Sequence, residues 1–310
     1  MPTERLDTVD LELDSRRPLR AIALLPAAAT LGNLLCGVLA LLACLMAVRS
    51  EYSTLFATQP RVHAYLAHFF PTHIAIGAYL IVLAMIFDAL DGRLARIARR
   101  TSEFGAQLDS IADIVSFGVA PVVLFITILF RPSSETEPSL LVSGWQWRLS
   151  VLCALVYVSC AAIRLARYNA ENVRDESGQR RFSGLPTPGA AAAFTALLVL
   201  HEDLATAPAA GFDWAEAVRW TMALAAFALG LLMVSRLDYV HVFNVYVRRE
   251  HPPIHLVWIV VALVIAWFSP QLLLVGVAYA YVLSGLVLNW VNRRTAAREK
   301  VLSAVEPSEN

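Results

Sequence analysis

Four aspartates stand inside or beside apolar segments of the sequence. Asp88 and Asp91 interrupt one apolar run, and Asp109 and Asp113 stand near the start of the next. An ionised side chain near the centre of a bilayer costs about 2.5–3.5 kcal/mol on insertion scales, and less near the interface. Four uncompensated acids would be strongly unfavourable, so we expect a compensating partner for them.

Helical spacing gathers these acids on two faces. Asp88 and Asp91 are three positions apart and Asp109 and Asp113 are four apart, so each pair shares one face of a helix. A hairpin that turns near residues 99–103 would let the four carboxylates converge. Hard divalent cations such as Mg²⁺ or Mn²⁺ prefer oxygen ligands of this kind. The spacing therefore predicts a metal site between two helices.

The residues around the acids favour a ligand site over simple ion pairing. Gly92 and Gly105 leave room for a bulky ligand near the backbone, and Arg96 is suited to a phosphate. The alternative is a set of structural ion pairs with Arg93, Arg96 and Arg99. Ion pairs that only join two helices would not need four acids on the facing sides of both. They would also not require the glycines.

The composition predicts an all-α, polytopic integral membrane protein. Of the 310 residues 58% are hydrophobic and 16% are charged, and the mean hydropathy is +0.59. The apolar runs are long enough to cross a bilayer, which takes roughly 20 residues. We expect about eight transmembrane helices, near residues 27–48, 73–98, 105–130, 149–169, 187–201, 217–235, 254–268 and 271–292.

The basic residues predict the orientation. With eight spans and a cytoplasmic N-terminus, cytoplasmic segments hold all of the lysine and arginine except Arg49, Arg61, Arg131, Arg148 and Arg219. This asymmetry follows the positive-inside rule. Both termini and the acidic hairpin would then face the cytoplasm. The predicted organisation is a cytoplasmic tail over 1–20, a membrane domain over 21–292 and a second cytoplasmic tail over 293–310.

The acidic pattern resembles a family signature. Asp88-x2-Asp91-Gly92-x2-Ala95-Arg96-x8-Gly105-x3-Asp109-x3-Asp113 is similar to the signature of the CDP-alcohol phosphatidyltransferase family at every fixed position. Residues 109–121, 164–169 and 182–188 resemble its phosphatidylserine synthase branch. The resemblance covers roughly residues 22 to 290. It implies metal-dependent transfer of a phosphatidyl group from CDP-diacylglycerol to the hydroxyl of L-serine, giving phosphatidylserine and CMP.

The resemblance also implies roles for individual residues. Asp88, Asp91 and Asp109 would bind two Mg²⁺ or Mn²⁺ ions, and Asp113 would be both ligand and general base. The CDP-lipid would contact Gly92, Arg96, Ser102, Gly105, Thr30 and Asn33, although Ala27 follows Pro26 where relatives often carry asparagine. The acceptor serine would be held near Arg164, Arg167 and Asn169.

Partners and rival functions complete the expectations. The resemblance implies a homodimer in the inner, cytoplasmic membrane among membrane lipids, and the formal net charge of +0 suggests no nucleic-acid partner. The same transfer to glycerol phosphate, an inositol phosphate or choline is an alternative. A cation transporter is an alternative of another class. It is disfavoured because acids are concentrated in one cluster and paired broken helices are missing.

Overall fold

The structure, a computed structural model, describes residues 17–52, 72–98, 103–130, 144–174, 184–206, 214–237 and 254–305, with Phe70 and Tyr239. Helices and short turns make up this part of the chain, and it contains no strand. Most of the predicted N-terminal tail and residues 306–310 lie outside it. In chain order the helices are α2 (Arg17–Tyr52), α4 (His73–Ala98), α5 (Glu103–Asp113), η1 (Ile114–Val119), α6 (Ala120–Leu129), α7 (Trp145–Arg174), α8 (Thr187–Thr206), α9 (Trp214–Val234), α11 (Ile254–Phe268) and α12 (Pro270–Val305).

Six helical stretches in the described ranges are long and apolar enough to cross a membrane. They are Leu25–Arg49, His73–Leu94, Phe104–Leu129, Trp145–Ala170, Ala217–Val234 and Pro270–Asn292. The predicted fold class, an all-α polytopic membrane protein, is confirmed. The other two predicted spans are helical as well, as α8 and α11. However, the 15 residues of α11 rise only about 22 Å, so the count of eight crossings stays a prediction.

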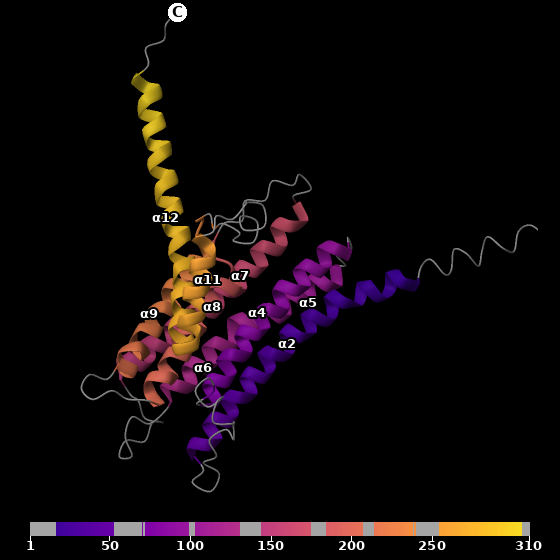
Figure 1. The fold of residues 1–310 in the computed structure, drawn as a ribbon, viewed down its shortest axis with the longest axis vertical. Coiled ribbons are helices and arrows are strands. Elements are labelled where there is room, and N and C mark those ends of the chain that lie inside the picture. The colour runs from indigo at the N-terminus through magenta and orange to yellow at the C-terminus, as the bar shows by residue number, and fades with distance from the viewer. Residues whose placement is uncertain are drawn as a thin grey trace, which may run out of the picture.

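Helix α8 lies in the middle of the bundle. Its side chains are buried around most of its circumference, including Ala190, Ala191, Phe194 and Leu198. It packs against α4, α9 and α12. In Figure 1, α2, α4 and α5 lie side by side along one edge of the bundle, and α12 projects well beyond it. The leucines exposed on the outer helices suit a lipid environment, because lipid tails are as apolar as leucine.

Small residues let α2 and α4 approach closely, which sets the frame for the acids on α4. Ala40 and Ala43 of α2 and Ala78 of α4 are buried. A Cβ built on Gly77 would lie 2.8 Å from a methyl carbon of Leu124 and 3.2 Å from the Ala40 carbonyl oxygen. Helix pairs in membranes use small residues in this way, because close backbones gain packing contacts.

A π-helical turn, η1, separates α5 from α6. The backbone N–H of Ala120 donates to Val115 O, five residues back. Pro121 follows and lacks the N–H that would have donated to Phe117 O in an α-helix. That carbonyl instead accepts a hydrogen bond of 3.0 Å from the buried Tyr157 hydroxyl of α7. The carbonyl that the widened turn leaves without a backbone donor thus finds its partner on a neighbouring helix. Such π-helical turns are frequent at functional sites.

Candidate active site

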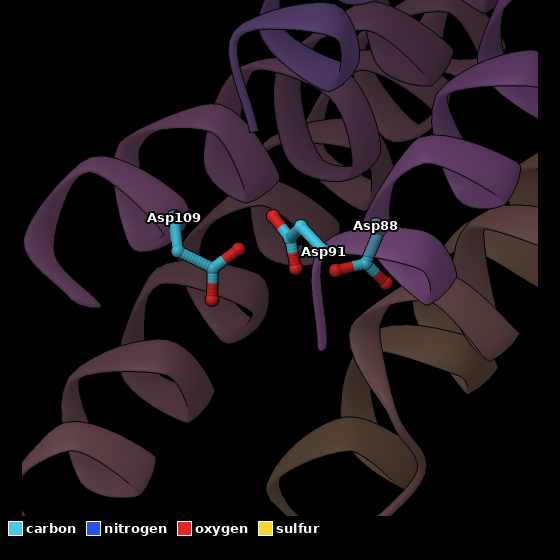
Figure 2. A group of neighbouring side chains, drawn as sticks. All are labelled: Asp88, Asp91 and Asp109. Atoms are coloured by element: carbon cyan, nitrogen blue, oxygen red, sulfur yellow. The ribbon is translucent and has the colours of Figure 1, made fainter. Parts of the chain in front are cut away.

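Three of the four predicted acids meet between α4 and α5. Asp88, Asp91 and Asp109 each offer a carboxylate oxygen, and these atoms all lie within 4.8 Å of one another. Figure 2 shows Asp88 and Asp91 extending from one helix toward Asp109 on the other, with Asp91 between them in this view. The i, i+3 spacing on α4 therefore directs both of its acids toward the facing helix.

The acidic cluster Asp88–Asp91–Asp109 has the donor set for a divalent cation. All its ligand atoms are carboxylate oxygens, which Mg²⁺ and Mn²⁺ prefer. Asp109 Oδ1 is buried and has no hydrogen-bond partner among the described residues. A buried acceptor without a partner is unfavourable, and a bound cation would satisfy it. The cluster can hold a divalent metal ion, whereas the identity and number of ions stay predictions.

Asp113 ends α5, one turn after Asp109, and points to α2. Its side chain is 8% exposed. Its Oδ1 accepts a hydrogen bond of 3.1 Å from Nδ2 of Asn33. The electrostatic repulsion of Asp88 and Asp109 reaches it, although it is not one of the three acids whose oxygens gather most closely. Asp113 therefore lies one helical turn from Asp109 of the cluster, and its roles as base and further ligand stay predictions.

Helix α2 supplies two polar side chains to the acids. Thr30 Oγ1 lies 2.7 Å from Asp91 Oδ2 and 3.0 Å from the carbonyl oxygen of Pro26. Asn33, one turn later, donates to Asp113. Both side chains are buried, at 5% and 0% exposure. Their predicted contact with the CDP group stays a prediction, and their contacts in the structure are with the carboxylates.

The other residues predicted to hold the CDP-lipid are described only in part. A Cβ added to Gly92 would meet no described atom within 4 Å, so there is open space beside Asp91. Gly105 is half-buried on α5. The side chain of Arg96 and the whole of Ser102 lie outside the described residues, as does Arg99 from the ion-pair alternative. The open space at Gly92 is compatible with a bulky ligand.

The turn before α8 places a hydroxyl against Arg164. Gly184 has φ +94°, a backbone region that favours glycine, and its N–H donates to Leu237 O at 2.8 Å. Three residues later, buried Thr187 accepts a hydrogen bond of 3.1 Å from Nη1 of Arg164. The sequence motif contained Thr187 but gave it no role, because its partner lies on another helix.

Arg164, one of the residues predicted to bind the acceptor, lies on α7 beside this turn, and that role stays a prediction. Its Nε is buried and finds no partner in the described part of the chain. Asp113 is among the charged groups around its guanidinium. Asn169 donates to Ser110 Oγ at 2.8 Å and so contacts the helix of the acids. Arg167 lies 3.4 Å from the carbonyl oxygen of Val234, at the end of α9.

A family comparison agrees with this geometry. A model of the family described as CDP-alcohol phosphatidyltransferase matches residues 23–234. This chain belongs to that family. The matched phosphatidyltransferase region runs from α2 to the end of α9, and so includes all four acids, Arg164 and Thr187. Helices α11 and α12 follow it.

Individual relatives share one printed name, CDP-diacylglycerol–serine O-phosphatidyltransferase. The Mycobacterium bovis protein is 30% identical over 206 residues, which cover 65% of this chain and 64% of the relative. The Methanocaldococcus jannaschii protein is 35% identical over 160 residues, 52% of this chain and 61% of the relative. The Saccharomyces cerevisiae protein is 37% identical over 123 residues, 38% of this chain and 39% of the relative. The chain thus spans less than two thirds of the length of these phosphatidyltransferase relatives.

Proposed function

We propose that the protein transfers the phosphatidyl group of CDP-diacylglycerol to the hydroxyl of L-serine, releasing CMP. The observation that carries the proposal is the convergence of Asp88, Asp91 and Asp109 from two apolar helices to within 4.8 Å. Membership of the CDP-alcohol phosphatidyltransferase family supports the reaction class. The names of the relatives support serine as the acceptor.

The acids divide the work between metal binding and proton transfer. Asp88, Asp91 and Asp109 would hold Mg²⁺ or Mn²⁺, which when bound would neutralise negative charge on the pyrophosphate oxygens and on the leaving CMP. Asp113 accepts the proton of the attacking hydroxyl. The serine oxygen forms a bond to the phosphorus that carries diacylglycerol, and the bond from this phosphorus to the CMP oxygen breaks. CMP leaves with the electron pair of that bond.

Arg164 supports an acceptor that carries an anionic group. Thr187 occupies Nη1, while Nε is buried without a partner among the described residues. A guanidinium edge that includes Nε can hold a carboxylate through two parallel hydrogen bonds. A carboxylate-bearing acceptor bound there would sit near the Asp113 base. Choline, a cation, would be repelled, whereas glycerol phosphate and inositol phosphate would be attracted, so these two remain the rivals to serine.

The proposal places the site at the cytoplasmic face of the inner membrane. The distribution of arginine supports cytoplasmic termini and a cytoplasmic acidic hairpin. There, both soluble serine and a bilayer-bound CDP-lipid reach the acids. We also propose a homodimer, on the family resemblance alone, and cross-linking in native membranes tests it.

A panel of acceptors tests the function. Purified protein is supplied with CDP-diacylglycerol, Mn²⁺ or Mg²⁺, and labelled serine, glycerol phosphate, inositol phosphate or choline. We expect release of CMP and labelled phosphatidylserine, with loss of both when EDTA removes the metal. A phosphatidyl product from another alcohol, with none from serine, would overturn the acceptor. No CMP release with any alcohol would overturn the reaction class.

A further inference from the structure

We propose that α2 is a positioning helix, in which Thr30 and Asn33 orient the carboxylates of Asp91 and Asp113. The two residues are three positions apart, so they share one face of α2. They bond to acids on two different helices. One polar stripe of α2 thus fixes one acid of the metal cluster and the proposed base together.

Asn33 and Thr30 are buried against the acids. Asn33 is 0% exposed and Thr30 is 5% exposed, next to Asp91 at 7% and Asp113 at 8%. Nδ2 of Asn33 faces Asp113, while its Oδ1 is buried and has no hydrogen-bond partner within the described ranges. The reverse amide orientation would place that oxygen against the carboxylate. The site therefore tolerates one unsatisfied oxygen so that the amide N–H can hold Asp113.

Backbone contacts hold Asn33 at this position. Ser116 of η1 donates to the carbonyl oxygen of Asn33 at 2.9 Å. One turn along α2, a Cβ on Gly37 would lie 2.9 Å from Ser116 Cα, and closer still to its Oγ. Helix α2 is thus held against the backbone just after Asp113. The side-chain amide of Asn33 therefore has little freedom to turn away from Asp113.

Each tethered acid keeps one oxygen for chemistry. Asp91 is bonded through Oδ2 and Asp113 through Oδ1. The remaining oxygen of Asp91 would be left for the cation, and that of Asp113 for the acceptor hydroxyl. Residues that orient metal ligands in this way typically change metal affinity or activity by 10–100-fold when they are replaced.

Two near-isosteric replacements test the inference. Asn33→Leu removes the amide, and we expect kcat to fall by about 10–100-fold while the KM for CDP-diacylglycerol changes little. Thr30→Val removes the hydroxyl, and we expect Mn²⁺ affinity, measured by calorimetric titration without substrates, to fall by about tenfold or more. Thr30→Ser keeps the hydroxyl and should restore Mn²⁺ affinity.

Thr127→Val is the structural control, because it removes a buried hydroxyl of α6 that donates to Val123 O of the same helix at 2.8 Å. The inference is overturned if Thr127→Val lowers kcat as much as Asn33→Leu does. It is also overturned if either replacement raises the KM for CDP-diacylglycerol and leaves kcat and Mn²⁺ affinity unchanged. Should Asn33→Leu fail to fold, Asn33→Ala carries the same expectation. The kcat arm rests on the proposed function, whereas the Mn²⁺ arm needs no turnover, so the two failures are distinguishable.

Discussion

Replacement of Arg164 by methionine would remove the proposed partner of the acceptor carboxylate. Thr187 already holds one side of the guanidinium at 3.1 Å, and Nε is buried, so little ordering is needed on binding. Hydrogen bonds to charged groups contribute about 1.5–3 kcal/mol. At 1.36 kcal/mol per tenfold, the KM for serine should rise about tenfold to 150-fold. Thr187→Val should raise it about twofold to tenfold, because that bond is to a neutral hydroxyl.

Ethanolamine makes this a controlled experiment, since it is serine without the carboxylate. CMP release is measured with each acceptor at saturating CDP-diacylglycerol. We expect Arg164→Met to lower kcat/KM for serine and to leave any activity with ethanolamine unchanged. Arg167→Met, the same change one turn along α7, should have the smaller effect. A serine KM that stays within about twofold in Arg164→Met is incompatible with carboxylate binding by this guanidinium.

Three further changes follow from the contacts described above. Asp109→Asn should abolish Mn²⁺ binding in calorimetric titration, and CMP release with it. If the variant bound Mn²⁺ as tightly as the wild type, Asp109 would not be a metal ligand. Asp113→Asn should insert into membranes normally but lose about 10²–10⁴-fold in turnover, and near-normal turnover would refute its role as base. Tyr157→Phe frees the carbonyl of Phe117 and should destabilise the protein by about 1 kcal/mol; an unchanged melting temperature in detergent would contradict this.

The fold class could be predicted because long apolar runs have few structures open to them in a bilayer. The position of α8 could not. Its alanine-rich sequence predicts only a short apolar segment. Its burial around most of its circumference depends on α4, α9 and α12, which pack around it. The turn η1 was also missed. Hydrophobic periodicity shows which face of a helix is apolar, but it does not show whether a backbone hydrogen bond spans four or five residues. Pro121 was the available signal.

The acids of the site were predictable because they are local. Asp88 and Asp91 lie on one helix, and Asp109 lies on the next helix along the chain, within reach of them. The bonds from α2 join residues 61 and 80 positions apart, and no spacing rule connects such distant segments. For Thr30 and Asn33 the sequence supplied candidates for binding, and only the packing of α2 shows which atoms they contact.

The π-helical turn η1 holds one residue more than a turn of α-helix, because its hydrogen bond runs from Ala120 N–H to Val115 O, five residues back. Deleting one residue from Ile114–Val119 would let the turn close as α-helix, with the flanking faces of α5 and α6 nearly in phase. A deletion inside α5 would instead turn the residues on its two sides by about 100° against each other, so Asp109 and Asp113 would no longer share a face. The extra residue in η1 therefore makes this segment the part of the membrane-crossing helix in which a change of length is tolerated best.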